Sequence, residues 1–200
     1  GPERIREMVE WGAKFDKNGR KNYDLGREGG HTENRVVHYK DVTGAEIERA
    51  LLKAIDKLPN IDLLNHHYVV DLITEHHIPN ESFDKYNLNC YGAYVLDLKT
   101  QQIKKMSAKI TLMATGGCGH VYKNTTNPII ATGDGIGLAH RAKAKISNMA
   151  FIQFHPTAFY SNRMGQLSLI SEAVRGFGAK LCTKSGEPFM HKYDDRGELA

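Results

Sequence analysis

The pattern of apolar and polar positions predicts two amphipathic helices in the first third of the chain. In residues 2–15 the apolar side chains recur near one helical face, and Pro2 suits the first turn. Residues 43–58 follow the helical period over more turns, and Thr43 with Glu46 three residues later forms a capping-box pattern at their start. We therefore expect two helices that each bury one face.

After these helices the chain alternates short apolar runs with polar or small-residue segments. Strands are predicted for residues 61–64, 68–73, 90–98, 102–106, 110–114 and 150–154, with residues 90–106 forming a hairpin. The other segments are predicted to be loops at 16–34 and 74–89, a small-residue helix at 135–146, and a helix or turn at 167–176. This mixture indicates an α/β fold.

Composition narrows the class of protein without identifying it. Of the 200 residues, 40% are hydrophobic and 25% are charged, as in ordinary soluble globular proteins, and the formal net charge is +4. No run of basic residues suggests a nucleic-acid-binding protein, and no apolar run approaches the roughly 20 residues of a membrane span. The cysteines Cys90, Cys118 and Cys182 form no CxxC pair, so we expect no metal site and no disulfide framework, and a cytoplasmic location is favoured.

The segment Gln-Phe-His-Pro-Thr around His155 carries the most distinctive candidate chemistry. Pro156 restricts His155 to extended backbone, so the imidazole is expected to leave the chain in a fixed direction. Ser171 and Glu172 follow in the next stretch of chain. A fixed histidine, a hydroxyl and a carboxylate suit a pocket that binds a small dicarboxylate and moves protons. Taken alone, His155 is better explained as a hydrogen-bonded core histidine and Thr157 as a turn former.

Two glycine-rich segments suit the close approach of a nucleotide to the main chain. The apolar run 110–114 leads into Thr115-Gly116-Gly117, and Gly133-Asp134-Gly135 follows later in the chain. Glycine lacks the Cβ atom that would keep a phosphate or an adenine away from the backbone. Each segment alone is weak evidence, since a plain turn or a close helix–strand contact is the simpler explanation.

Taken in order along the chain, these motifs resemble those of the succinate dehydrogenase and fumarate reductase flavoprotein superfamily. The residues that carry the resemblance are 114–117, 125–128 (Thr-Thr-Asn-Pro), 132–135 (Thr-Gly-Asp-Gly), 153–157 and 171–176. Within this superfamily the chain is most similar to the L-aspartate oxidases. The resemblance implies the middle of a Rossmann-like FAD-binding domain at residues 1–149 and the start of a substrate-capping domain at residues 150–200.

The resemblance also implies that FAD, bound without a covalent link, is the cofactor. The residues that match the family's FAD site are Asp41, Val70, Ala114, Thr115, Gly116, Gly117 and Asp134. The family's main FAD fingerprint, GxGxxG on the first strand, is expected before Gly1, and its substrate-binding arginine is expected after Ala200. The chain is therefore expected to be an internal piece of a longer protein, inactive by itself.

The implied reaction is the FAD-dependent oxidation of L-aspartate to iminoaspartate by hydride transfer to the flavin, in the quinolinate route to NAD. The family match assigns His155 and Ser171 to a substrate carboxylate and Glu172 to a proton relay. Thr157 is assigned to the substrate-binding residues, chiefly as support of the loop. Arg175 shares a helical face with Glu172 and could pair with it, although such a pair would equally be an ordinary surface ion pair. The implied partners are L-aspartate or a related dicarboxylate and, functionally, quinolinate synthase.

Glu28 separates the branches of the superfamily. In Arg-Glu-Gly-Gly-His its carboxylate occupies a place that succinate dehydrogenases fill with an apolar aromatic side chain. An anion there suits the ammonium group of aspartate and would repel a simple dicarboxylate, so Glu28 is assigned to substrate binding and catalysis. A solvated loop glutamate is the alternative for this residue. For the whole chain the alternatives are a fumarate reductase or succinate dehydrogenase flavoprotein, and a folded, non-catalytic module.

Overall fold

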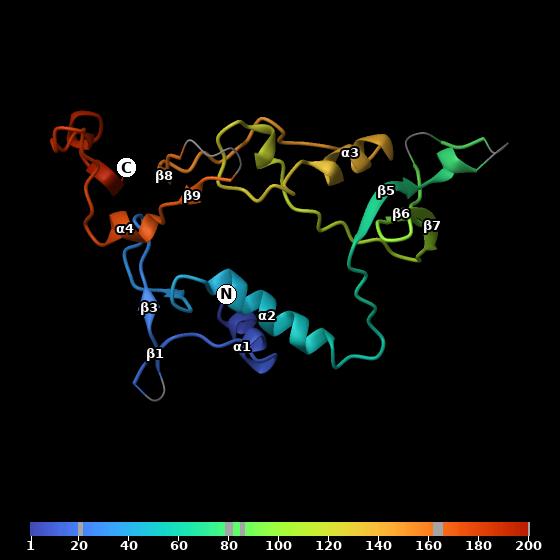
Figure 1. Ribbon diagram of the computed structural model, residues 1–200, viewed down its shortest axis with the longest axis horizontal. Helices are drawn as coiled ribbons and strands as arrows, with labels where there is room; N and C mark the ends of the chain where they lie inside the picture. Colours follow the sequence, from blue (N-terminus) through green and yellow to red (C-terminus); the bar gives the residue numbers. More distant parts are fainter. Residues whose placement is uncertain (20–21, 79–81, 85–86, 162–165, 200) are drawn as a thin grey trace. The chain divides into compact units, whose positions relative to one another are not determined.

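The computed structural model describes residues 1–19, 22–78, 82–84, 87–161 and 166–199 (Figure 1). The chain divides into two compact units. The first unit comprises Gly1–Leu63 and Ile170–Ala200, and the second comprises Leu64–Leu169. The predicted boundary between residues 149 and 150 concerns the domains of the longer protein, and it stays a prediction.

The first unit is built on the two helices that the apolar pattern predicts. They are α1 (Pro2–Glu10) and α2 (Thr43–Ile55), both a few residues shorter than expected at the C-terminal end. Their apolar faces meet around a small core of Ala13, Phe15 and Ala50. The segment between the helices, predicted to be a loop at 16–34, contains short antiparallel strands, of which the last lies beyond that range. They are β1 (Lys17–Asn18), β2 (Asn22–Tyr23), β3 (Leu25–Gly26) and β4 (Val36–Val37).

The predicted capping box at the start of α2 is wrong. Val42 is the N-cap residue, and the Thr43 hydroxyl accepts a hydrogen bond from the Tyr39 amide. The Glu46 carboxylate turns away from the helix end because it has stronger partners. It accepts a 2.8 Å hydrogen bond from the Lys14 amide and charge-assisted bonds from the Arg49 guanidinium.

The second unit contains an antiparallel sheet in the order β5-β6-β7. Its strands are β5 (His67–Ile73), β6 (Gly92–Asp97) and β7 (Gln102–Ser107), so the strand at 68–73 and the hairpin are confirmed. The register of β5 against β6 shifts between Val69 and Asp71, which leaves Val70 as an extra, bulged residue.

Three of the predicted strands are not formed. Residues 61–64, 110–114 and 150–154 adopt no strand in the described chain. A strand needs a neighbour for its amide and carbonyl groups, and these segments have none among the described residues. Ile110 and Leu112 are both 87% exposed as a result.

The remaining elements are short. In the second unit, α3 (Asp134–Arg141) ends five residues earlier than predicted, and β8 (Ala158–Phe159) pairs with β9 (Ser168–Leu169). In the first unit, the predicted helix or turn at 167–176 contains α4 (Glu172–Gly176). Single 3-10 turns are η1 (Glu75–His77), η2 (Gly119–Val121), η3 (Met190–Lys192) and η4 (Gly197–Leu199).

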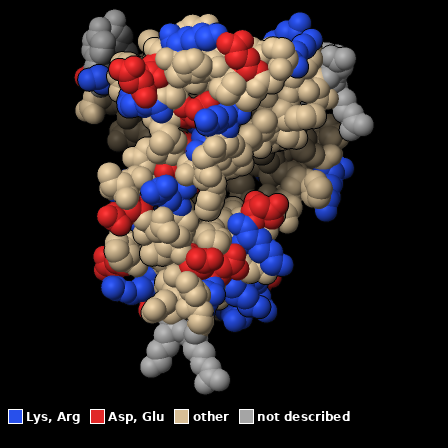
Figure 2. Space-filling model, turned by 90° about the vertical axis from the view of Figure 1, so that its left-hand side faces the viewer, with Lys and Arg blue, Asp and Glu red and all other residues tan. Residues whose placement is uncertain are grey.

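The surface charge and the length of the apolar helices are those expected from the composition. On the face that Figure 2 shows, basic and acidic side chains are interspersed among uncharged ones. No helix in the described part of the chain is long and apolar enough to cross a membrane. The described residues also contain no cluster of three or more His, Cys, Asp and Glu side chains able to hold a metal ion.

Candidate active site

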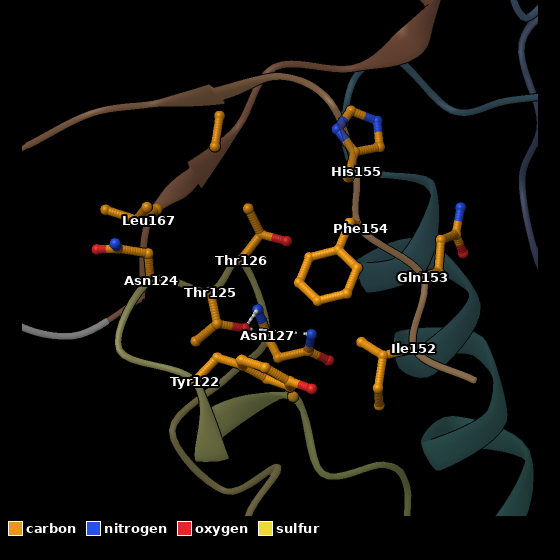
Figure 3. A pocket seen from close by; sticks show the side chains of 12 residues that line it. Tyr122, Asn124, Thr125, Thr126, Asn127, Ile152, Gln153, Phe154, His155 and Leu167 are labelled. Atoms are coloured by element: carbon orange, nitrogen blue, oxygen red, sulfur yellow. Dashed lines mark hydrogen bonds between the residues drawn. The ribbon is translucent and has the colours of Figure 1, made fainter. Parts of the chain in front are cut away.

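A pocket of about 220 Å³ in the second unit opens beside His155 (Figure 3). Its walls come from η2 and the loop after it, from the segment that ends at His155, and from the β8–β9 pair. The lining residues are Gly119, Tyr122, Asn124, Thr125, Thr126, Asn127, Ile152, Gln153, Phe154, His155, Ala158 and Leu167. The Thr-Thr-Asn-Pro motif and the Gln-Phe-His-Pro-Thr motif therefore meet at one cavity.

Backbone and side-chain hydrogen bonds hold the Thr-Thr-Asn loop in place. The Leu167 amide donates to the Thr125 carbonyl at 2.8 Å, and the Gln166 side-chain amide donates to the Thr126 carbonyl at 2.9 Å. Within the loop, the Asn127 amide donates to the Thr125 hydroxyl oxygen at 3.1 Å (Figure 3). The polar wall of the pocket is thus fixed by the two residues that directly precede β9.

An aromatic pair forms another part of the wall. The rings of Tyr122 and Phe154 meet edge to face, with centroids 5.5 Å apart and planes at 77° (Figure 3). Ligand pockets commonly combine such apolar walls with a few fixed polar groups. The arrangement suits a small polar molecule whose charged end meets His155.

The ring orientation of His155 is fixed by the backbone of Thr157. Nδ1 of His155 lies 2.9 Å from the Thr157 carbonyl oxygen and 3.3 Å from the Thr157 amide nitrogen. The shorter contact is a hydrogen bond only if Nδ1 carries the proton, because a carbonyl oxygen cannot donate. Nε2 is then left to bind or exchange a proton with a ligand. Thr157 is 6% exposed and acts here through its main chain.

A second group of predicted site residues meets in the first unit. The Arg-Glu-Gly-Gly-His loop packs on α4: a Cβ atom on Gly176 would lie 3.1 Å from the Arg27 carbonyl, and one on Gly29 would lie 2.9 Å from Glu172 Oε1. Oε2 of Glu28 is buried and has no hydrogen-bond partner among the described residues. The structure thus brings Glu28 and Glu172 into neighbouring segments, beside a pocket of about 310 Å³ lined by Leu25, Gly26, Arg27, Asn34, Gly176 and Phe177.

Ser171 has a structural task that the sequence analysis missed. It is the N-cap of α4, and its Oγ accepts a 3.2 Å hydrogen bond from the Ala173 amide. Its hydroxyl proton can still be donated to a ligand. A serine directly before an acidic first turn was a readable signal for this cap.

Arg175 does not form the predicted pair with Glu172 within the described chain. Its Nη1 atom instead donates a 2.7 Å hydrogen bond to the Glu198 carbonyl, and its Nε atom is buried without a partner among the described residues. The Glu198 carboxylate accepts a 2.9 Å bond from the Leu181 amide, and this bond is the main cause that lowers the pKa of Glu198. Arg175 is therefore held by η4 at the edge of the Glu28 and Glu172 group.

The two glycine-rich segments lie against each other in the second unit. Ala114 to Gly117 are exposed, and Gly116 has a φ of 75°. A Cβ atom on Gly135 would overlap the Thr115 side chain, so this glycine lets the start of α3 approach the Thr-Gly-Gly segment. Asp134 is exposed in the first turn of α3.

Two further residues predicted for the cofactor, Val70 and Asp41, lie outside the two glycine-rich segments. Val70 is the bulged residue of β5, and its carbonyl oxygen accepts a 3.0 Å hydrogen bond from Arg141 of α3. Asp41 is exposed in the turn before α2, in the first unit. The structure therefore groups Val70 with α3 and leaves Asp41 in the other unit.

Comparison with known proteins identifies the family. The family model described as "FAD binding domain" matches residues 1–200. The chain belongs to this FAD-binding domain family. It is 49% identical to an L-aspartate oxidase of Oryza sativa subsp. japonica, over all of this chain and 31% of that protein. It is 43% identical to L-aspartate oxidase 1 of Ralstonia nicotianae, over 99% of this chain and 37% of that protein. The chain spans about a third of the length of these curated relatives.

Solved structures of the FAD-binding domain family have the same fold. A quinol-fumarate reductase structure aligns with a TM-score of 0.82 at 27% identity, over 96% of this chain and 31% of that chain. The Sdh1 structure of Mycobacterium smegmatis aligns with a TM-score of 0.72 at 31% identity, over 94% of this chain and 32% of that chain. These matches confirm the α/β assignment and the predicted superfamily.

The segments of this FAD-binding domain fit the cofactor that the family name implies. No atom lies within 4 Å of where a Cβ on Gly116 or Gly117 would stand, so a ligand can reach the main chain there. The amino end of α3 lies against this segment, and the first amide groups of a helix have no partner within the helix itself. The carboxylate of Asp134 suits hydroxyl groups of a nucleotide. Thr115, Gly116, Gly117 and Asp134 are therefore the residues that would hold part of FAD.

Proposed function

We propose that the longer protein containing this chain is an FAD-dependent L-aspartate oxidase that converts L-aspartate to iminoaspartate. The proposal is supported by 38–49% identity to proteins named L-aspartate oxidase across nearly the whole chain. The structural observation that carries it is the half-buried Glu28 side chain, whose Oε2 atom is buried without a hydrogen-bond partner among the described residues, beside the Glu172 segment. A carboxylate oxygen removed from water is stabilised by a cation, and the ammonium group of aspartate supplies one.

The segments of Thr115, Gly116, Gly117 and Asp134 would hold part of FAD, which would supply the acceptor for a hydride from the substrate Cα atom. The protein's own residues bind the substrate and handle its proton. In the imidazolium form of His155, Nδ1–H donates to the Thr157 carbonyl and Nε2–H donates to one substrate carboxylate. The Ser171 hydroxyl donates its proton to a carboxylate, and Glu172 takes part in proton transfer.

Glu28 provides the selectivity in this proposal. Its carboxylate attracts the ammonium group of L-aspartate and repels a dicarboxylate without an amine, such as succinate. The neighbouring Gly29 keeps the space that the Glu172 carboxylate occupies. Both acidic side chains can therefore serve one substrate, one through charge and one through a proton.

The cellular role follows from the product. Iminoaspartate is the precursor of quinolinate, so we place the protein in NAD biosynthesis, in functional partnership with quinolinate synthase. The cytoplasmic location expected from the sequence stays a prediction, because the relatives include proteins named chloroplastic as well as bacterial ones.

The test is anaerobic reduction of the flavin in the FAD-loaded full-length protein. L-aspartate and succinate are added separately, and bleaching of the flavin band is followed. Bleaching by L-aspartate alone is the expected result. Bleaching by succinate alone would move the protein to the succinate dehydrogenase and fumarate reductase branch, and bleaching by neither would reduce it to a non-catalytic FAD-binding module.

The His155→Ala variant tests the carboxylate-binding step within the same assay. Removing a hydrogen bond to a charged group is expected to raise the half-saturating L-aspartate concentration roughly 10- to 100-fold. His140→Ala is the control, since His140 is exposed on α3 and lines none of the pockets described above. An unchanged concentration dependence in His155→Ala would contradict the assigned role.

A further inference from the structure

The bulge in β5 leaves Val70 without an opposite residue in β6. Val69 faces Val95 and Asp71 faces Tyr94. A bulged residue is left out of the ladder, so a side chain from another element can bond its main chain. The position of this bulge is of interest because Val70 matches the family's FAD site.

Arg141, the last residue of α3, supplies that side chain. Its Nη2 atom donates to the Val70 carbonyl at 3.0 Å, and its Nε atom donates to Asp71 Oδ1 at 3.3 Å. One guanidinium thus bonds both the main chain and the side chain at the bulge. Arginine is suited to this because its donors lie in a rigid planar fork.

The Asp71 carboxylate is itself oriented by other groups. The Leu72 amide donates to Asp71 Oδ1 at 3.0 Å, and Nε2 of His77 lies 3.8 Å from Asp71 Oδ2. The Asp71 carboxylate that binds Arg141 is therefore held in place by other groups of the second unit. It fixes the carboxyl end of α3 against β5.

The amino end of the same helix is fixed against the glycine-rich segment. Gly135 is in contact with Thr115, and Gly133, with a φ of 80°, turns the chain into the helix. Asp134 lies between these two glycines. With eight residues at about 1.5 Å each, α3 is a rigid rod of roughly 12 Å that joins the Asp134 end to the Val70 bulge.

We propose that Arg141 is a positioning residue for FAD, which holds α3 on the β5 bulge so that Asp134 and Val70 keep the spacing that the cofactor requires. In this proposal Arg141 acts through its bonds to Val70 and Asp71 and not by contact with the substrate. The inference rests on the membership of the FAD-binding domain family and goes beyond the proposed oxidase reaction. Replacing Arg141 is expected to change the affinity for FAD and not the rate of the chemical step.

The size of the effect is limited by exposure. The side chains of Arg141 and Asp71 are 52% and 26% exposed, and ion pairs of this kind contribute at most about 1 kcal/mol. The Arg141→Met variant, which keeps a long side chain but no donors, is therefore expected to raise the Kd for FAD roughly fivefold. Arg141→Lys keeps the charge without the fork, so an intermediate Kd is expected.

The experiment titrates FAD into the FAD-free full-length protein and follows flavin fluorescence. Lys104→Met is the matched control, because Lys104 forms a 2.8 Å ion pair with Asp97 in the same sheet. The side chain of Lys104 is 50% exposed, a fraction similar to the 52% of Arg141. The Kd of Lys104→Met for FAD is expected to equal that of the wild type. The thermal midpoint of each FAD-free variant is measured in parallel.

The outcomes separate a positioning role from a general loss of stability. A raised Kd in Arg141→Met, with a thermal midpoint lowered no more than in Lys104→Met, supports the inference. A Kd equal to that of the wild type, or an equal rise in Lys104→Met, overturns it. A raised Kd in a protein whose flavin L-aspartate does not reduce would still support the inference, and would refute only the proposed substrate.

Discussion

The Glu172 carboxylate fills the space where a side chain on residue 29 would stand: a Cβ atom on Gly29 would lie 2.9 Å from Oε1 of Glu172. The two residues are far apart in the sequence and come from different motifs, the Arg-Glu-Gly-Gly-His loop and the start of α4. The backbone of residue 29 does not require glycine, because its φ does not lie in the left-handed region. Glycine is required at this position because the Glu172 carboxylate occupies the space of a side chain.

Replacing Gly29 by alanine should therefore act on Glu172. The added methyl group would push the carboxylate from its position, and we expect the rate constant of flavin reduction by L-aspartate to fall roughly 10- to 100-fold. Stopped-flow reduction of the full-length protein measures this. Gly30→Ala is the control, since no atom lies within 4 Å of a Cβ there. Equal rates in Gly29→Ala and the wild type would contradict the proposed role of Glu172.

A second prediction concerns substrate selectivity. Glu28→Gln keeps the size of the side chain and removes the charge that is proposed to meet the ammonium group. We expect kcat/KM for L-aspartate to fall at least roughly tenfold, while binding of succinate becomes tighter. Steady-state kinetics with succinate as a competitive inhibitor measures both. Glu33→Gln, an exposed glutamate of the same loop, should behave as the wild type. Parallel losses for both ligands would exclude a charge-based role for Glu28.

Elements that depend on local sequence were the easier part of the fold to predict. The helices α1 and α2 and the β6–β7 hairpin follow from apolar period and turn residues alone. The strand predicted at 110–114 depends on a neighbour, which the described chain does not supply, and Ile110 is exposed as a result. The capping box failed because Arg49 and Lys14 compete for Glu46, and Lys14 is distant in sequence.

The candidate site was predictable only through the combination of motifs. Resemblance to a flavoprotein family suggested that Glu28 and Glu172 act at one site, and the structure brings their segments together. The lining role of Tyr122 was missed, because a lone tyrosine before a Thr-Thr-Asn-Pro motif carries no signal of its own. The bonds from Arg141 to the bulge could not be predicted, since nothing in the sequence shows where the bulge lies or that Arg141 donates to the Val70 carbonyl.

Acid should destabilise the α1–α2 packing through Glu46. The Arg49 hydrogen bond, opposed by burial and helped by the Lys14 amide, lowers the pKa of Glu46 from 4.5 to about 2. A carboxyl with a lowered folded-state pKa stabilises the fold fully above its unfolded value of about 4.3, and this stabilisation is lost as the pH falls toward about 2. The loss therefore falls between about pH 4.5 and pH 2.

The Glu46→Gln variant isolates this contribution. Its thermal midpoint should lie below that of the wild type at pH 7, and the difference should shrink as the pH is lowered from 5 to about 2.5. Thermal unfolding followed by circular dichroism at a series of pH values measures it. Glu48→Gln, on the exposed face of the same helix, should follow the wild-type curve. A difference between Glu46→Gln and the wild type that is independent of pH would rule out the ionised carboxylate as the cause.

The contact of Gly135 with Thr115 yields the last prediction. A methyl group on residue 135 would overlap the Thr115 side chain, so Gly135→Ala should push α3 away from the Thr-Gly-Gly segment. Because Asp134 and Gly116 would then lose their spacing, we expect the Kd for FAD to rise at least roughly tenfold, more than for loss of the partly exposed bonds of Arg141. Gly137→Ala in the same helix is the control, since its Cβ would make only an ordinary 3.5 Å contact with Arg141. Titration of FAD into the two FAD-free full-length variants measures the difference, and equal Kd values would show that the Thr115 contact does not shape the cofactor site.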